Sequence, residues 1–426
     1  MASFALKTPI SSVYLHLPFC FHKCHYCDFY SVVDTPNTTQ PSNTDRQPAF
    51  TDALIAEVRR RAAQADIQPV TIFAGGGTPT YLRPDLWAKL LDCLREVGWL
   101  AGQSAGGTGI LPVGAPSTFE FTVEANPETV TAELMQQLAL GGVNRVSIGA
   151  QSFDTTSLKQ LERWHDPDSV PRAVEHCRAA GITNLSLDLI FAIPGQTLAM
   201  LERDLDALLA LTPTHLSTYG LTYEPNTPLT AKLRVGQVKQ IDEDLEREMF
   251  ELVLNKVEAA GFEHYEVSNW ARREVNSEQS TVNSKDKTAH CSRFTVHRTK
   301  CAHNLAYWHN HDWLGLGPSA ASHIQGHRWR NAPNLMRYIQ DAPAPPIADH
   351  EHLPPAQRLG ERIMLGLRLS EGLDADWLLN HPDLRDHQRE AIDEAATLGF
   401  LEQTDGRIRL TRKGLFVADS VIAQVL

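Results

Sequence analysis

The chain has 426 residues, which at roughly 100–200 residues per domain indicates two or three domains. Its 42% hydrophobic and 21% charged residues are typical of a globular protein with a core of ordinary size. The formal net charge of −12 excludes nucleic-acid binding driven by bulk positive charge, and an odd number of seven cysteines in so long a chain excludes a disulfide framework.

Strand-like segments alternate with helical segments in the first part of the chain. Strands are expected at Val13–Leu17, Val70–Ala74, Phe119–Glu124, Arg145–Ala150, Asn184–Ile193 and His215–Leu221. Helices are expected at Arg46–Ala63, Asp85–Val97, Thr131–Ala139, Thr155–Ala180, Thr197–Leu211 and Asp242–Ala260. This alternation predicts an α/β fold with a parallel sheet and helical crossovers. Six such units indicate an incomplete (β/α)6 barrel, with an open doubly wound sheet as the alternative. In both folds, active-site residues lie at the C-terminal ends of the strands.

Three segments have the composition of insertions or linkers, namely Val33–Pro48, Ala101–Thr118 and Arg272–Thr299. After Pro354 the pattern changes to helices at Arg358–Leu369 and Asp386–Leu398, a hairpin turn at Thr404-Asp405-Gly406, and a last helix over Gly414–Leu426. This order resembles a small, mainly helical, winged-helix-like domain. We therefore expect a barrel domain over 1–270, a linking segment over 271–353 and a C-terminal domain over 354–426. The last domain has more acidic than basic residues, which favours a packing or lid role over DNA binding.

No stretch reaches the ~18 apolar residues that a membrane span needs. The first ten residues lack the pattern of a secretory signal, so we expect a cytoplasmic protein. In that compartment thiols stay reduced, and clustered cysteines usually bind a metal or act in catalysis.

Three cysteines, Cys20, Cys24 and Cys27, follow the first strand in a CxxxCxxC pattern. Thiolates this close in sequence can hold one soft metal centre from a single loop. Zinc is one option, with His22 or His25 as a fourth ligand. A four-iron cluster with one iron left open is the other. A third interpretation is three buried small residues without a metal.

CxxxCxxC after the first strand of a βα array resembles the radical S-adenosylmethionine superfamily. The resemblance implies a [4Fe-4S] cluster whose open iron binds S-adenosylmethionine, and a radical formed when the reduced cluster cleaves it. It also implies that Tyr26, between the second and third cysteines, packs near the adenine. The glycines of Gly75-Gly76-Gly77-Thr78-Pro79 end the second strand and allow a ligand to approach the backbone closely.

Further motifs resemble the oxygen-independent coproporphyrinogen III oxidase family over nearly the whole chain. They include SNWAR at Ser268–Arg272, HNLAYW at His303–Trp308 and GLGPSA at Gly315–Ala320. By this resemblance, the residues that contact S-adenosylmethionine are Tyr14, Gly76, Gly77, Thr78, Glu124, Gln151, Arg163 and Asp188.

Two departures separate the chain from the oxidase. The oxidase has a fourth cysteine two residues after the third, where this chain has Phe29, and it has a longer N-terminal arm. Both departures, together with HNxxYW, resemble the HemW-type heme chaperones. That resemblance implies heme and a hemoprotein acceptor as partners, no nucleic acid, and membrane contact only through an acceptor; it leaves a homodimer open. We expect no coproporphyrinogen III dehydrogenase activity. The alternatives are the oxidase itself, which decarboxylates propionates, and a zinc-binding interaction module.

Heme binding usually needs an axial ligand such as His, Cys or Met. His303 of the HNxxYW motif is our first candidate, and hydrogen bonding to a strand end is its alternative role. His165 is the second candidate, although a structural contact near Arg163 suits it better. His309 and His311 remain unranked. Cys93 and Cys177 are expected in the core, and Cys291 and Cys301 beside the polar insertion.

Overall fold

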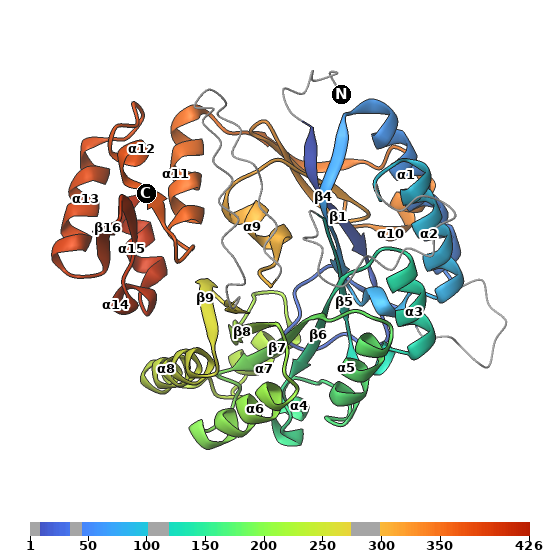
Figure 1. Cartoon of the computed structure of the whole chain (residues 1–426), viewed down its shortest axis with the longest axis horizontal. Helices are drawn as coiled ribbons and strands as arrows, with labels where there is room; N and C mark the ends of the chain where they lie inside the picture. The colour runs from blue at the N-terminus through green and yellow to red at the C-terminus, as the bar shows by residue number, and fades with distance from the viewer. Residues whose placement is uncertain (1–8, 35–44, 101–118, 274–298) are drawn as a thin grey trace, which may run out of the picture.

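The structure, a computed structural model, describes residues 9–34, 45–100, 119–273 and 299–426. It has a large α/β part and a smaller C-terminal domain beside it (Figure 1). Most of each predicted insertion lies outside the described residues, over 35–44, 101–118 and 274–298.

Six parallel strands lie side by side in chain order at the centre of a twelve-stranded sheet. They are β1 (Ile10–Leu17), β4 (Ile67–Gly76), β5 (Glu120–Ala125), β6 (Arg145–Gln151), β7 (Asn184–Phe191) and β8 (His215–Gly220). Most of their residues are buried, as expected where helices cover one face of a parallel sheet and other chain segments the other. The predicted incomplete (β/α)6 barrel is confirmed.

The crossover helices pack around the outside of this sheet (Figure 1). They are α1 (Gln47–Gln64), α2 (Pro84–Glu96), α3 (Ala132–Leu140), α4 (Thr155–Gln160), α5 (Ser169–Ala179), α6 (Leu198–Ala210), α7 (Pro228–Arg234) and α8 (Glu243–Ala259). The predicted helix over Thr155–Ala180 is wrong in one respect, because it is two helices. The first helix ends in a Schellman turn: Glu162 has a left-handed backbone (φ 52°), and the N–H groups of Glu162 and Arg163 donate to the Lys159 and Leu158 carbonyls at 3.1 and 2.9 Å. This turn carries Arg163 toward the strand ends.

Additional strands extend the sheet at both edges. On the β1 side, β11 (Trp313–Leu316) is parallel to β1, and β12 (Ala321–Ile324), β13 (His327–Asn331) and β14 (Ile347–His352) follow in antiparallel order. On the β8 side, β10 (Asn269–Arg272) and β9 (Phe262–Glu266) are antiparallel. Two short helices, α9 (Ala302–Trp308) and α10 (Leu335–Gln340), accompany the first group. The segment 271–353, expected to be a polar insertion and a linking segment with the HNxxYW motif, thus contributes β11 to β14 to the sheet.

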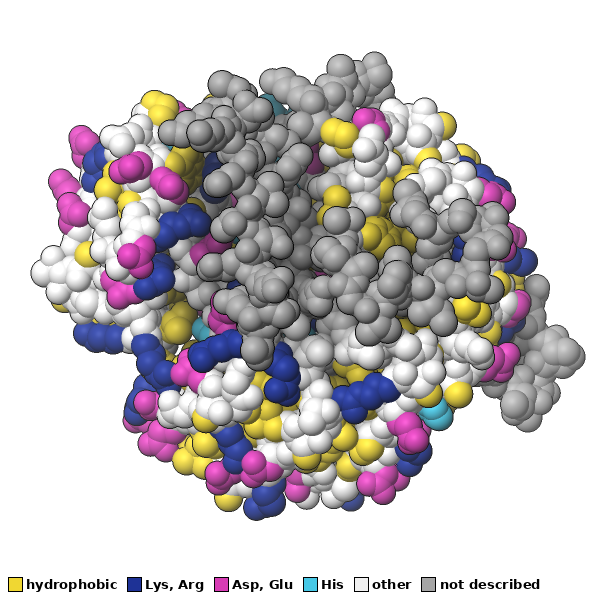
Figure 2. Space-filling model, viewed as in Figure 1, with side chains coloured by type: hydrophobic (Ala, Val, Ile, Leu, Met, Phe, Trp, Pro, Cys, Tyr) yellow, Lys and Arg dark blue, Asp and Glu magenta, His cyan; other side chains and the backbone are white. Residues whose placement is uncertain are grey.

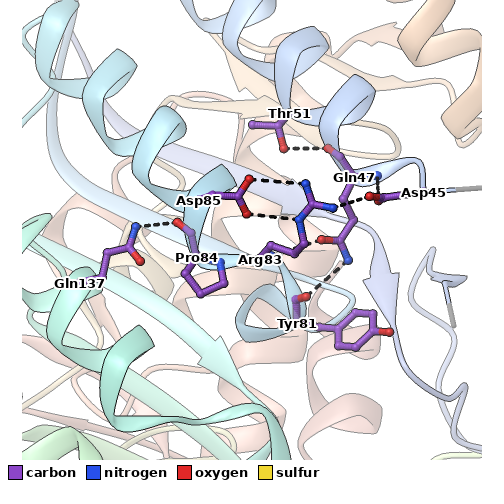
Figure 3. Close-up of polar contacts among 8 residues, drawn as sticks. All are labelled: Asp45, Gln47, Thr51, Tyr81, Arg83, Pro84, Asp85 and Gln137. Atoms are coloured by element: carbon purple, nitrogen blue, oxygen red, sulfur yellow. Dashed lines mark hydrogen bonds and ion pairs between the residues drawn. The ribbon is translucent and has the colours of Figure 1, made fainter. Parts of the chain in front are cut away.

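Polar contacts fix the segment that follows the glycine-rich end of β4 (Figure 3). After the 3-10 helix Pro79–Tyr81, the Arg83 guanidinium pairs with Asp45 and, at 3.2 Å from Nε, with Asp85. The Gln47 side chain at the start of α1 accepts from the Arg83 backbone N–H at 3.2 Å and donates to the Tyr81 carbonyl at 3.4 Å. The start of α1 thus holds the turn into α2.

The C-terminal domain has its own hydrophobic core. Its elements are α11 (Pro355–Gly366), β15 (Leu373–Asp374), α12 (Ala375–Leu379), α13 (Asp386–Thr397), β16 (Leu401–Thr404), β17 (Arg407–Leu410), α14 (Arg412–Leu415) and α15 (Ala418–Val425). The three strands form a small separate sheet. The winged-helix-like prediction is confirmed, except that the last helix is divided in two. Arg412 reaches Glu258 of α8 at 3.2 Å, and Phe416 packs edge-on against Phe250 with ring centroids 5.6 Å apart.

Both signs of charge are mixed on the face that Figure 2 shows, with Lys and Arg next to Asp and Glu. Within the described ranges, no helix is long and apolar enough to cross a membrane.

Candidate functional site

The three clustered cysteines lie in a loop directly after β1. Cys20 belongs to the short strand β2 (Phe19–Cys20), which pairs with β3 (Val32–Val33), and it is buried, as is Cys24. The Cys27 N–H donates to the Cys24 carbonyl at 3.2 Å, which closes a tight turn between these two thiols. Cys27 is half-buried. One loop therefore presents all three thiols at the C-terminal end of the first strand.

Burial disfavours the thiolate form of these cysteines, whereas hydrogen-bond donors from Thr78 and Arg163 favour it. Burial raises the pKa of Cys20, although the Thr78 hydroxyl donates to its Sγ at 3.6 Å, and burial raises the pKa of Cys27 to about 11. Arg163 Nη1 donates to Cys24 Sγ at 3.5 Å. Such thiols lose their protons when a cation binds to the sulfur.

In the described part of the chain, no three His, Cys, Asp or Glu side chains converge tightly enough to hold a single metal ion. A four-iron cluster does not need that convergence, because each thiolate binds a different iron. The loop nevertheless keeps the thiols in electrostatic contact, since Cys20 and Cys24 both raise the pKa of Cys27 beyond the larger effect of burial.

The glycine-rich end of β4 lies against this loop. Gly77 N–H donates to the Leu17 carbonyl and Thr78 N–H to the Phe19 carbonyl, each at 2.8 Å. A Cβ at Gly77 would lie 2.7 Å from the Phe19 carbonyl oxygen, and one at Gly75 would lie 2.8 Å from Glu124 Oε2. These glycines are therefore required for the close approach of the backbone to the cysteine loop and to Glu124.

Two carboxylates lie on β5 and β7, the strands on either side of β6. Glu124 Oε2 accepts from the Gly76 N–H at 3.3 Å, and Asp188 accepts from Ser147 at 3.0 Å and from Ser186 at 3.2 Å. Burial, and then the charge of Asp188, raise the pKa of Glu124 to about 7. Burial also raises the pKa of Asp188. Two nearby carboxylates with raised pKa values are suited to a cationic ligand.

Arg163 and Gln151 come together at the end of β6. Arg163 Nη2 donates to the Gly149 carbonyl at 3.0 Å, and its Nε donates to His165 Nδ1 at 3.2 Å. Gln151 has a left-handed backbone (φ 64°) at a register shift between β6 and β7, and a Cβ on Gly149 would lie 2.6 Å from its Nε2. The irregular strand end thus folds Gln151 back over Gly149, next to Arg163.

Tyr14 and Tyr26 approach the same region from β1 and the cysteine loop. The Tyr14 hydroxyl lies 3.1 Å from His16 Nδ1, and the charge of Glu124 adds to burial in raising its pKa. The pKa of Tyr26 is raised by burial, while Arg163 acts in the opposite direction.

The polar side chains that the resemblance names all remain half-buried while the strand residues around them are buried. They are Tyr14, Tyr26, Thr78, Glu124, Gln151, Arg163 and Asp188. The site is therefore open to a ligand.

His16 belongs to this site, and sequence reasoning missed it. It is buried in β1, its Nε2 lies 2.8 Å from the Tyr30 carbonyl, and a Cβ on Gly76 would fall 2.5 Å from its ring. Burial lowers its pKa to about 4. The available signal was a histidine inside an otherwise apolar strand.

His303 lies deeper, against β4. Its Nδ1 is 2.9 Å from the Thr71 hydroxyl and its Nε2 is 2.9 Å from the Tyr307 hydroxyl, and burial lowers its pKa to about 3. Iron coordination at either nitrogen would replace one of these hydrogen bonds. Its role as a heme ligand stays a prediction.

The other heme-ligand candidates are spread over the molecule. His165 is buried beside Arg163, whereas His309 and His311 lie together at the end of α9, near the C-terminal domain. Cys93, Cys177 and Cys301 are buried, and Cys291 lies outside the described residues.

Comparisons with known proteins agree with this arrangement. Residues 14–208 match the family model of the radical SAM superfamily, and residues 353–417 match the HemN C-terminal domain. Among solved structures, the coproporphyrinogen III oxidase HemN of Escherichia coli, a radical SAM enzyme, is similar with a TM-score of 0.76 and 20% identity. That likeness covers 99% of this chain and 92% of the other.

Similar sequences extend over the full length. The heme chaperone HemW of Bacillus subtilis is 30% identical over 98% of this chain and 99% of its own length. The heme chaperone HemW of Mycobacterium tuberculosis is 33% identical over 97% and 94%. The chain therefore belongs to the HemW family of the radical SAM superfamily.

Proposed function

We propose that this protein is a heme chaperone: it binds heme and passes it to an acceptor hemoprotein. We further propose that its scaffold holds a [4Fe-4S] cluster on Cys20, Cys24 and Cys27, together with S-adenosylmethionine. The observation that carries the proposal is a full-length likeness to proteins named as heme chaperones, in a chain whose cysteine loop lies near the carboxylates Glu124 and Asp188.

The donor set fits an iron–sulfur cluster. Three thiols are available from one loop, and Arg163 supplies positive charge beside Cys24 Sγ. When bound, the cluster would supply one iron without a protein ligand, to which a small molecule can bind. Arg163, with its Nη1 on the sulfur and Nη2 on the Gly149 carbonyl, would hold the thiolate side of the loop in place.

The polar groups around the loop fit S-adenosylmethionine, which carries positive charge on its sulfonium and amino groups. Glu124 and Asp188 would balance that charge, and the backbone of Gly76, Gly77 and Thr78 can approach the ligand closely. Tyr14, Tyr26, Gln151 and Arg163 would complete the set of contacts.

The residue that replaces the oxidase's fourth cysteine supports a chaperone over an oxidase. The Phe29 side chain is 67% exposed, and it has no atom that can bind iron. The cysteine loop thus has three thiols and an apolar side chain facing solvent. We propose that the protein does not decarboxylate coproporphyrinogen III.

Anaerobic reconstitution tests the cluster. Protein incubated with iron and sulfide should gain the broad visible absorption and the reduced-state EPR signal of a four-iron cluster. Cys20→Ala, Cys24→Ala and Cys27→Ala should each abolish both signals, whereas Cys93→Ala, which removes a buried core thiol, should keep them. A colourless product that holds only zinc would overturn the cluster proposal.

Titration with hemin tests the heme proposal separately. Saturable binding with a shifted Soret band is expected from both the apo and the reconstituted protein. Uptake no stronger than that of an unrelated acidic protein would overturn it.

A further inference from the structure

A pocket of about 290 Å³ lies where the end of α9 meets the C-terminal domain. It is lined by aromatic, histidine and arginine side chains, among them Trp308, His309, His311, Arg362, Trp377 and Arg407. This volume is at the lower end for small-molecule sites, so the pocket can take one edge of a large flat ligand and leave the rest accessible.

The end of α9 fixes the two histidines beside each other. The Asn310 N–H donates to the Tyr307 carbonyl and the His311 N–H to the Ala306 carbonyl, each at 2.9 Å, and Asn310 is left-handed (φ 56°). This is a Schellman motif, whose left-handed position is most often glycine and sometimes Asn, as here. As a result, the rings of His309 and His311 stack with centroids 5.6 Å apart.

The same turn is tied to the C-terminal domain. Asn310 Nδ2 donates to Glu361 Oε2 of α11 at 3.0 Å. His309 Nε2 lies 3.7 Å from Glu371, whose other oxygen is 3.8 Å from Arg407 Nη2. His309 and Arg407 thus share one carboxylate, and the pocket is built from both parts of the molecule.

Arg362 provides a cation that the protein itself does not neutralise. Its guanidinium lies over the Trp377 ring at 4.0 Å, and within the described ranges it has no hydrogen bond or ion pair. The pocket walls partly desolvate it and lower its pKa. A guanidinium in this state gains from a carboxylate ligand, which it can bind through two hydrogen bonds.

His311 is suited to binding iron. Burial, and then the charges of His309 and Arg362, lower its pKa to about 4, so its imidazole is neutral at physiological pH. Neutral imidazole is the form that binds metals.

We propose that this pocket is the heme-docking site, with the His309–His311 pair supplying the axial imidazole and Arg362 and Arg407 binding the propionates. Trp308 and Trp377 would contact the macrocycle. The proposal rests on the proposed heme function and names its site. An edge-on pocket leaves part of the macrocycle outside the protein, where an acceptor can reach it.

Parallel titrations with hemin and with iron-free protoporphyrin IX separate the two kinds of contact. The double variant H309A/H311A should bind hemin at least roughly tenfold more weakly and shift its Soret band, with protoporphyrin affinity unchanged. The double variant R362Q/R407Q should lose affinity for both compounds by roughly tenfold or more. His387→Ala, an exposed histidine of α13, is the matched control and should change neither.

Unchanged hemin affinity and spectrum in H309A/H311A, while the wild type binds hemin, would overturn the site and leave the chaperone proposal intact. The proposed site would also be overturned if His303→Ala alone removed the Soret shift of bound hemin while its thermal unfolding curve stayed unchanged. If the wild type itself takes up no hemin, the proposed function fails first. Each variant is compared with the wild type in thermal unfolding and in cluster absorbance, so that a folding defect is recognised.

Discussion

The Glu124 carboxylate, proposed to contact S-adenosylmethionine, lowers the free energy of unfolding when it is charged. Its carboxyl group ends β5 among protein atoms and faces a second carboxylate, Asp188, so its pKa rises to about 7 from a usual 4.5. Between these two pH values the folded protein binds a proton that the unfolded chain does not. The stability that this proton contributes is complete below pH 4.5 and is lost as the pH rises through 7.

We predict that Glu124→Gln raises the free energy of unfolding at pH 8, by up to about 3 kcal/mol, because it removes a partly desolvated charge. The value is an upper limit, since solvent reaches part of this side chain. At pH 4.5 the variant and the wild type should differ little. Urea unfolding at both pH values measures this, and an equal effect at both would contradict the assigned pKa.

Gly76 at the end of β4 is needed for two reasons, its backbone conformation and the lack of space for a side chain, and Gly98 after α2 shares only the first. Gly76 has a left-handed backbone (φ 105°), and a Cβ there would meet the His16 ring, which is itself held by the Tyr30 carbonyl. Gly98 has a similar φ of 77° and no atom within 4 Å of the position of a Cβ.

Gly76→Ala should therefore destabilise the protein by roughly 3 kcal/mol, from backbone strain together with a steric clash. Gly98→Ala should cost only the strain, about 1 kcal/mol. Urea unfolding compares the two variants. Equal losses would show that the His16 ring can move away from a Cβ at position 76.

At the scale of elements, a buried carboxylate of β5 holds the helix that contains the HNxxYW motif. Glu120 accepts from the N–H groups of Ala302 at 2.9 Å and His303 at 3.1 Å. These two N–H groups have no partner within the helix, and a carboxylate at a helix N-terminus also interacts favourably with the helix dipole. Glu120 thus fixes α9 to the sheet.

Glu120→Gln should lower the free energy of unfolding by about 1–2 kcal/mol, because the charge-assisted hydrogen bonds to α9 become neutral or are lost. Glu96→Gln is the control: it removes an exposed ion pair with Arg59 and should change stability by less than about 1 kcal/mol. Chemical denaturation measures both. A smaller effect at Glu120 than at Glu96 would contradict its capping role.

The strands that could be predicted are those in which apolar, β-branched and aromatic residues are frequent and helical segments follow, because local pattern suffices for them. β11 could not be predicted, since its four residues take their place by pairing with β1 and β12, and Trp313 lies opposite Ser12, about 300 residues earlier in the chain. β13 has the polar sequence HRWRN, which local pattern does not mark as a strand.

The candidate site, like the fold, could be predicted only in part. Polar residues at the ends of predicted strands could be recognised from the sequence, since parallel strands bring them to one edge. The environment of His303 could not, because its partner Thr71 is 232 residues away and the bond depends on how α9 packs. The break between α4 and α5 likewise carries Arg163 to Cys24, a contact that only the folded chain shows.

Contacts along α8, β9 and the end of α9 attach the C-terminal domain to the large part of the molecule. Phe416 packs on the core of the large part, Arg412 pairs with Glu258, and an isolated bridge joins Glu266 to Leu369. The pocket proposed for heme depends on this attachment.

Phe416→Ala should loosen the attachment, because it removes the aromatic contact with Phe250, which together with burial is worth roughly 2–3 kcal/mol. Hydrogen exchange over residues 355–425 should accelerate while β4 to β7 stay protected, and hemin affinity should fall. Leu140→Ala, at an exposed position, serves as the control. Unchanged exchange in Phe416→Ala would show that other contacts hold the domain.

A side-by-side assay separates a heme chaperone from a decarboxylase. Reconstituted protein is titrated anaerobically with hemin, and in parallel it receives coproporphyrinogen III, S-adenosylmethionine and a reductant. We expect saturable hemin binding and no more decarboxylated product than Cys20→Ala forms. Harderoporphyrinogen or protoporphyrinogen formed over many turnovers by the wild type, and lost in Cys20→Ala, would contradict it.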